Sequence, residues 1–472
     1  MLFQTPEFAL LFIGTVVAFY AIAGRFRLHV LAVSSLGFYA ASGSLDFLLL
    51  LATLGISYVI SLRVRVGGPK WPIYIGVGLL LTNLAYLKYD DFIYQNLQSL
   101  FGSSLFSDRP QFLSTVLPLG ISFYTFQIIG YLIDLHKGRT ERTTSLLEYV
   151  VFVTFFAQLI AGPIMRAKDY LPQLRSLKGG NSDDLKSGGL LVFQGLIKKV
   201  VLADLIAARV DLRFAAESYT QPEAWIAAGL FAFQIYFDFS GYVDIALGLA
   251  RMLGIKLTKN FRTPYLSGNP SEFWGRWHIT LSNWFRDYLY IPLGGNRQGR
   301  SREIVNVMLV MAVAGLWHGA GWTFVMWGLI HGTYLAAHRF MPTDSLRSLV
   351  PAPAKHKAVI YRFVGIGVFF ILTVLAWIPF RAPDLTTALE MYRAAFTPAG
   401  LSVWIANIEW VVVIGGLFAL HVAEWWVNAR PDSVKALWSK VPALARGSAY
   451  AGALIVVIAF MSEQQTFIYF RF

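Results

Sequence analysis

The chain has 472 residues, of which 56% are hydrophobic and only 14% are charged, whereas soluble domains carry about 25% charged residues. Apolar runs recur along the whole length, which excludes an ordinary soluble enzyme and predicts an all-α polytopic membrane protein. The absence of cysteine excludes disulfides, thiolate metal sites and a cysteine nucleophile. Basic cytoplasmic loops are the first explanation for the net charge of +13, so no nucleic-acid partner is expected.

The apolar runs predict about 11–12 transmembrane helices in a single integral-membrane domain, residues 1–472. The predicted spans lie near 7–23, 29–42, 47–62, 72–88, 112–134, 189–209, 224–250, 304–318, 320–338, 362–379, 402–427 and 447–462. We interpret the first run as a retained helix, because it lacks a preceding basic segment and a small-residue cleavage site. Basic residues on alternate loops place both termini on the extracytoplasmic side.

Two stretches depart from this alternation. The run 147–165 has basic residues on both flanks, and Ala161–Pro163 supplies the helix break that a re-entrant loop needs. Residues 251–303 are too polar to span a membrane and are rich in arginine and lysine. We place this region at the cytoplasmic face, with 271–292 dipping into the membrane as amphipathic or re-entrant helices.

Two Trp-His pairs, Trp277-His278 and Trp317-His318, are the candidate catalytic site. His318 lies where two apolar segments join, and a neutral imidazole can take a proton from a hydroxyl that attacks a carbonyl. His278 could orient or polarise the same carbonyl. A purely structural role for each histidine is the alternative. No metal is expected, because the spacing does not match a His-Glu-x-x-His site and no cysteine completes a ligand set.

The predicted span 224–250 carries Asp238 and Asp244. Carboxylates in a membrane segment are expected to face the interior of the helix bundle. The simplest interpretation is that they bond to arginines or backbone donors and hold the fold together. A different class of function is a proton-coupled transporter that uses these carboxylates and the histidines as a proton relay. The sequence shows no inverted repeat that would support a transporter.

A set of motifs gives a more specific expectation. EFWGRWHITLSNWFRDYLYIPLGGNR and GLWHGAGWTFVMWGLIHG, with LIAGPIMR, QGLIKKVVLAD and YFDFSGYVDIALGL, make the chain resemble the bacterial membrane-bound O-acyltransferases, most closely their alginate O-acetyltransferase branch. The resemblance covers essentially the whole chain. It implies a ring of tilted helices around a thin central funnel, with His318 as catalytic base and His278 as the second histidine. Gly275 departs from the family, since many members carry a second arginine there.

The resemblance also implies a function. We expect a membrane O-acetyltransferase that takes an acetyl group from a cytoplasmic thioester such as acetyl-CoA, with no bound cofactor. The acetyl group would pass to the extracytoplasmic side for O-acetylation of an exported polysaccharide such as alginate. Peptidoglycan O-acetylation and teichoic acid D-alanylation are the alternatives within the family. Expected partners are an extracytoplasmic SGNH-type acetyltransferase subunit, the polysaccharide export machinery and the lipid of the bacterial inner membrane.

Several further residues are candidates around the two histidines. Trp317, Arg276, Arg286, Asp238 and His331 are expected to support the histidines or to bind the donor. Residues 463–472 form an extracytoplasmic aromatic tail whose end resembles a short motif of the D-alanylation branch. On that resemblance Tyr469 is a possible acyl relay, deprotonated by His318. The alternative is that the aromatic tail anchors at the membrane interface.

Overall fold

The computed structural model is helical and describes residues 3–102, 117–340, 354–461 and 467–468. These parts of the chain contain no strand. The chain divides into two compact units. Unit 1 consists of residues 1–196 and 242–259, and unit 2 consists of residues 197–241 and 260–472. A single long helix, α11 (Gln221–Met252), begins in unit 2 and ends in unit 1.

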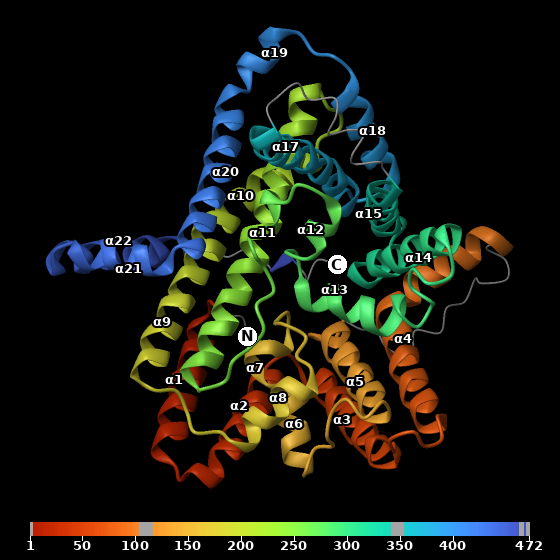
Figure 1. Ribbon diagram of the computed structural model, residues 1–472, viewed down its shortest axis with the longest axis vertical. Helices are drawn as coiled ribbons and strands as arrows, with labels where there is room; N and C mark the ends of the chain where they lie inside the picture. The colour runs from red at the N-terminus through yellow and green to blue at the C-terminus, as the bar shows by residue number, and fades with distance from the viewer. Residues whose placement is uncertain (1–2, 103–116, 341–353, 462–466, 469–472) are drawn as a thin grey trace. The chain divides into compact units, whose positions relative to one another are not determined.

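Unit 1 is built from helices that range from the short α7 to the long α4, and its helix α5 is strongly buried (Figure 1). The helices are α1 (Pro6–Ala21), α2 (Arg27–Ala40), α3 (Ser44–Arg63), α4 (Trp71–Phe101), α5 (Ile121–His136), α6 (Leu146–Thr154), α7 (Phe156–Leu159), α8 (Ala167–Arg175) and α9 (Ser182–Leu196). Helix α2 packs against α1 and α6, and α4 packs along α5. The predicted spans of this part therefore correspond to real helices.

The break predicted in the run 147–165 is present. Helix α6 ends at Thr154, α7 ends at Leu159, and the chain stays non-helical until α8. A Cβ atom at Gly162 would lie 2.3 Å from the Cα of Gln158, so the turn needs a residue without a side chain. Residues 160–165 are buried, which is the condition for non-helical backbone at membrane depth.

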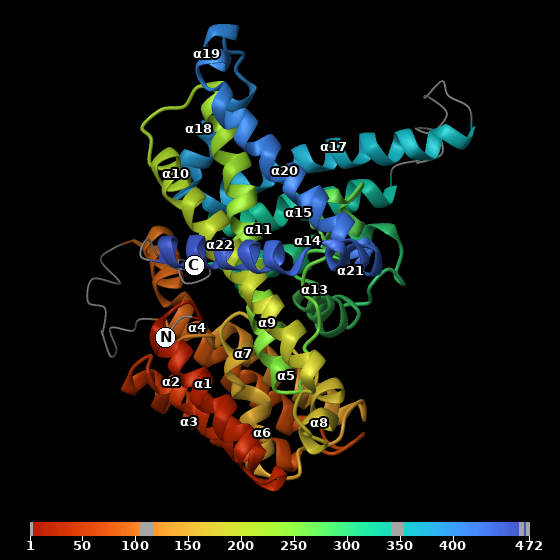
Figure 2. The same ribbon diagram turned by 90° about the vertical axis from the view of Figure 1, so that its left-hand side faces the viewer.

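Unit 2 carries the candidate site. After the π-helix Ile197–Ala203 come α10 (Asp204–Phe214), α11, α12 (Pro270–Trp274), α13 (Ile279–Phe285), the π-helix Arg286–Tyr290, α14 (Arg300–His318), α15 (Trp322–Phe340), α17 (Ala354–Arg381), α18 (Leu385–Phe396), α19 (Leu401–Ala406), α20 (Ile408–Ala429), α21 (Pro431–Lys440) and α22 (Ala443–Phe460). Figure 2 shows α20 beside α11, and a Cβ atom at Gly229 of α11 would lie 2.9 Å from Ile414 of α20. Helix α17 packs against α15 and α18.

The helices confirm a polytopic membrane protein. Five of the described helices are long and apolar enough to cross a membrane, and they lie at Ser44–Arg63, Gln221–Met252, Val359–Arg381, Ile408–Ala429 and Ala443–Phe460. The polar region 251–303 contains short helices, and its place at the cytoplasmic face stays a prediction. Helices α18 and α21 lie outside the predicted spans, because neither contains a long apolar run. The orientation of the termini stays a prediction.

Helices α14 and α15 form an antiparallel pair whose backbones touch. A Cβ atom at Gly315 would lie 2.1 Å from the carbonyl oxygen of Phe324, and one at Gly328 would lie 2.1 Å from the carbonyl oxygen of Met311. Small residues allow this close approach between membrane helices. The pair carries His318 at the end of α14 and His331 in the middle of α15, so its packing fixes where both imidazoles lie.

We therefore predict that Gly328→Ala destabilises the protein. The added methyl group meets backbone atoms that cannot move aside, and overpacking of this kind costs about 1–3 kcal/mol. The matched control is Gly367→Ala in α17, where a Cβ atom meets nothing within 4 Å. Thermal unfolding of the detergent-solubilised protein measures the difference. Equal melting temperatures for the two variants would contradict the tight helix pair.

Candidate active site

His318 is the last residue of α14 and lies in a ring of aromatic side chains. Its side chain is 3% exposed. The ring centroid lies 5.0 Å from those of Trp317 and Trp327 and 5.2 Å from that of Phe380. The helix ends at His318, because Gly319 has an extended backbone, and a Cβ atom at Gly319 would overlap the Phe324 ring. The two apolar segments therefore join at His318, as the sequence indicated.

His278 is also buried, and its backbone is unusual. It precedes α13 in the left-handed region, with φ of 42°, where histidine is more tolerated than most residues. Asn260 holds this turn: its carbonyl oxygen accepts the Ile279 N–H at 3.0 Å, and its side-chain oxygen accepts the Thr280 N–H and hydroxyl, both at 3.0 Å. The same oxygen lies 3.3 Å from Nδ1 of His278. Asn260 therefore sets both the backbone and the ring of His278.

Shared tryptophans connect the histidines. Trp317 packs edge-on against His278 at 6.0 Å and against His318 at 5.0 Å. Trp327 does the same for His318 and His331, at 5.0 Å from each. Edge-to-face packing fixes ring orientation as well as position. The structure thus brings His278 together with Trp317 and His318, which are adjacent to each other but lie much later in the sequence.

His331 is fully buried and is held by ring packing. It stacks on Phe273 at 5.7 Å and meets Trp274 edge-on at 5.2 Å. Within the described ranges, neither of its ring nitrogens has a hydrogen-bond partner. Because Trp327 contacts both imidazoles, His331 supports the ring that packs on His318.

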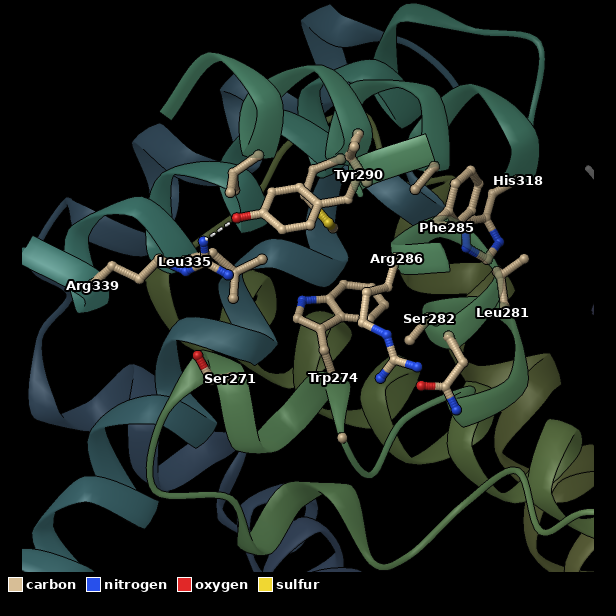
Figure 3. Close-up of a pocket in the computed structure, with 16 residues that line it drawn as sticks. Ser271, Trp274, Leu281, Ser282, Phe285, Arg286, Tyr290, His318, Leu335 and Arg339 are labelled. Atoms are coloured by element: carbon tan, nitrogen blue, oxygen red, sulfur yellow. Dashed lines mark hydrogen bonds between the residues drawn. The ribbon is translucent and has the colours of Figure 1, made fainter. Parts of the chain in front are cut away.

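A cavity of about 330 Å³ reaches His318 (Figure 3). Figure 3 shows His318 at one end and Arg339 at the other, with Trp274, Arg286 and Tyr290 between them. Its apolar walls include Leu281, Phe285, Val307, Val310, Met311 and Ala314. His278 does not line it. The cavity therefore links an arginine-bearing end to the imidazole of His318 alone.

The two arginines that line the cavity differ in how firmly other residues hold their side chains. Arg339 donates to the Tyr290 hydroxyl at 2.8 Å and pairs with Glu303, which ties the end of α15 to α14. Arg286 pairs with its neighbour Asp287, 2.7 Å from Nε to Oδ1, and its side chain is 57% exposed. Arg286 is therefore the more accessible cation for an anionic ligand.

Arg276 does not line the cavity. Its guanidinium pairs with the Glu272 carboxylate at 2.6 Å, and the same carboxylate pairs with Arg362 at 2.8 Å. Burial raises the pKa of the Glu272 carboxyl, but the hydrogen bonds from Arg362 and the Gly268 N–H, with the charge of Arg276, outweigh this and lower the pKa. Arg276 helps to fix α12, which carries Trp274 to the cavity.

Asp238 is bound to other parts of unit 2. One carboxylate oxygen lies 2.9 Å from Lys199 Nζ, and the other accepts the backbone N–H of Ile468 at 2.8 Å. The simplest interpretation named arginines or backbone donors as partners; the structure shows a backbone donor, Ile468, and a lysine, Lys199, in place of an arginine. Tyr469 lies outside the described residues. Within those residues, no group of three His, Asp or Glu side chains is arranged to hold a metal.

Three residues that position the site, Asn260, Trp327 and Lys199, were not predicted from the sequence. Trp327 lies within the motif GLWHGAGWTFVMWGLIHG but was not singled out, and Asn260 lies outside the motifs. Lys199 lies within QGLIKKVVLAD, where two adjacent lysines interrupt an apolar run. Charges inside a predicted span need partners, so that run could have signalled an interior ion pair.

The fold and the site together define a polytopic membrane protein with a buried imidazole at the end of a cavity. The sequence profile of the membrane-bound O-acyltransferase family matches residues 140–375. The chain belongs to this family, and it is an acyltransferase.

Its relatives include the probable alginate O-acetylase of Pseudomonas putida, 40% identical over 406 residues, which cover 84% of this chain and 80% of that protein. The peptidoglycan O-acetyltransferase of Helicobacter pylori is 35% identical over 443 residues, covering 85% and 81%. The teichoic acid D-alanyltransferase of Streptococcus thermophilus is 32% identical over 230 residues, covering 45% and 55%.

The contacts of Asn260 give a prediction. Asn260→Ala leaves the buried Thr280 N–H without its acceptor and releases the His278 ring, at a cost of about 1–3 kcal/mol. The control is Asn407→Ala, which removes an amide that bonds only within its own turn, to the Val403 carbonyl. Thermal unfolding measures stability, and acyl transfer at a permissive temperature measures the site. If Asn260→Ala matches the control in both, Asn260 does not hold His278.

Proposed function

We propose that the protein takes an acetyl group from a cytoplasmic thioester and passes it to the extracytoplasmic side, for O-acetylation of an exported polysaccharide such as alginate. The observation that carries this proposal is the cavity between Arg286, Arg339 and His318. A thioester donor such as acetyl-CoA has phosphates at one end and a short acyl group at the other. Arginines bind phosphate, and the apolar walls suit the less polar thioester end.

His318 acts as the general base in this proposal. Its neutral imidazole takes the proton of the acceptor hydroxyl while the hydroxyl oxygen attacks the thioester carbonyl. The new C–O bond forms, the C–S bond breaks, and the proton on the imidazole passes to the leaving thiolate. The products are an ester and a free thiol, and the imidazole returns to its neutral form. No redox step or metal is required.

His278 has the second role. It lies outside the cavity but shares Trp317 with His318. We assign it to the acceptor side, where it orients or polarises the acyl group. Its fixed backbone and its contact with Asn260 suit a group that must hold a defined position, since small displacements of positioning groups are costly to catalysis.

The acceptor is argued from the relatives. The alginate and peptidoglycan enzymes match most of this chain, whereas the teichoic acid enzyme matches less than half of it. O-acetylation therefore has more support than D-alanylation. An extracytoplasmic SGNH-type subunit and the export machinery would complete the transfer. Tyr469 remains the proposed acyl relay. Family membership disfavours a transporter, and Asp238 is bound in an ion pair instead of lining an open relay.

The first test is His318→Ala. Loss of the general base is expected to lower polymer acetylation by about 10²–10⁴-fold at an unchanged level of protein in the membrane. His29→Ala, on the exposed face of α2, is the control. Acetyl content of the isolated polymer measures the result. Normal acetylation in His318→Ala cells would remove His318 from the mechanism.

The second test concerns the donor. Arg286→Ala removes a cation from the cavity, so KM for acetyl-CoA should rise about tenfold while kcat changes little. Arg302→Ala is the control, because Arg302 is exposed and does not line the cavity. Thiol release from acetyl-CoA by membranes that contain the protein gives both constants. An identical KM in the two variants would place the donor elsewhere.

A further inference from the structure

A group of buried charges lies behind the catalytic region of unit 2. Lys199, in the π-helix Ile197–Ala203, lies 2.7 Å from Asp204 Oδ1 and 2.9 Å from Asp238 Oδ1. The three side chains are 1%, 4% and 3% exposed. An ion pair buried this deeply is weak evidence for stability, because desolvation offsets much of the attraction. A further role for the carboxylate of Asp238 is therefore worth seeking.

The second oxygen of Asp238 binds the C-terminal tail. The N–H of Ile468 donates to Asp238 Oδ2 at 2.8 Å. Phe467 and Ile468 are 1% and 2% exposed, so the tail is seated at this point and does not lie on the surface. Beyond Phe460, where α22 ends, these two residues carry the chain back into the interior of unit 2.

The seated tail lies close to the wall that holds His278. The ring of Phe467 lies 6.1 Å from that of Phe239, one residue after Asp238, and Phe239 packs edge-on against His278 at 4.8 Å. A single aromatic ring thus separates the tail from the second histidine. A shift of the tail would change the packing on Phe239 and, through it, on His278.

The contact between Asp238 and the Ile468 backbone is selective for a hydrogen-bond donor. An ionised carboxylate only accepts hydrogen bonds, and a backbone N–H only donates one, so the pair is matched and is strengthened by the charge. Lys199 Nζ lies 2.9 Å from the other oxygen of the same carboxylate, so Asp238 has a donor on each side. The site therefore recognises an N–H at one position of the chain, which sets the register of the tail.

We propose that Asp238, supported by Lys199, is a positioning residue that binds the C-terminal tail at Ile468 and holds it against the Phe239–His278 wall on the acceptor side. Binding of the tail does not depend on what reaction the protein catalyses. Its effect on acetyl transfer rests on the proposed function. Because Ile468 directly precedes Tyr469, the same anchor would set where the proposed relay begins.

Binding is tested by thiol labelling. The chain has no cysteine, so Phe467→Cys places a single reporter on the seated tail of the full-length protein. The reporter should react slowly with a maleimide in the folded protein. Adding Asp238→Ala or Ile468→Pro, which removes the N–H donor, should speed labelling about tenfold, because the tail opens more often.

Two matched changes serve as controls. Asp432→Ala removes an exposed carboxylate in the first turn of α21, and Ile468→Val keeps the N–H. Both should label within about twofold of the reporter protein. Three results would overturn the proposal: a reporter as fast as in the unfolded chain, no acceleration by Ile468→Pro, or equal acceleration by Asp432→Ala. If Asp238→Ala does not fold, Ile468→Pro decides, because it changes only the tail.

The effect on the reaction is tested separately, in chains without the reporter. Polymer acetylation should fall about tenfold in Ile468→Pro and be restored by Ile468→Val at the same protein level. Faster labelling with normal acetylation would show that Asp238 binds the tail but does not position the reaction. If the wild-type chain supports no acetylation at all, the proposed function fails, whereas the labelling result still tests the binding site.

Discussion

Lys198 and Lys199 are neighbours in an otherwise apolar stretch of unit 2, and each needs a counter-charge. Acidic side chains of α10, α11 and α20 supply these counter-charges. Lys199 faces Asp204 and Asp238. Lys198 pairs with Glu424 of α20 at 2.5 Å, and the Tyr236 hydroxyl donates to the same carboxylate at 2.7 Å. The π-helix therefore connects α10, α11 and α20 by charge. Removing one partner of a buried ion pair destabilises a protein by more than the intact pair stabilises it. The arrangement of these helices therefore depends on both ion pairs.

The catalytic region uses a different means of positioning. The imidazoles of His278, His318 and His331 are held mainly by tryptophan and phenylalanine rings. Aromatic contacts fix a ring without adding charge close to it. The cationic side chains of the cavity are Arg339, at the end opposite His318, and Arg286, between the two (Figure 3).

Much of the fold could be predicted from the sequence, because long apolar runs mark membrane-spanning helices. The apolar runs gave α3, α11, α17, α20 and α22 close to their true ends, and Ala161–Pro163 marked a real break. Hydropathy could not show α18 and α21, which are short and amphipathic. The Trp-His pairs pointed to the right part of the chain. Sequence could not show that Asn260 holds His278, or that only His318 meets the cavity, because both depend on packing between distant segments.

The left-handed backbone of His278 restricts which residues can occupy this position. The turn that begins α13 has positive φ, which glycine, asparagine, aspartate and histidine tolerate and which strongly disfavours β-branched residues. Of these four residues, only histidine brings an imidazole to the Trp317 ring. A β-branched replacement would strain the turn, whereas glycine, asparagine or aspartate would keep the turn and leave that contact empty.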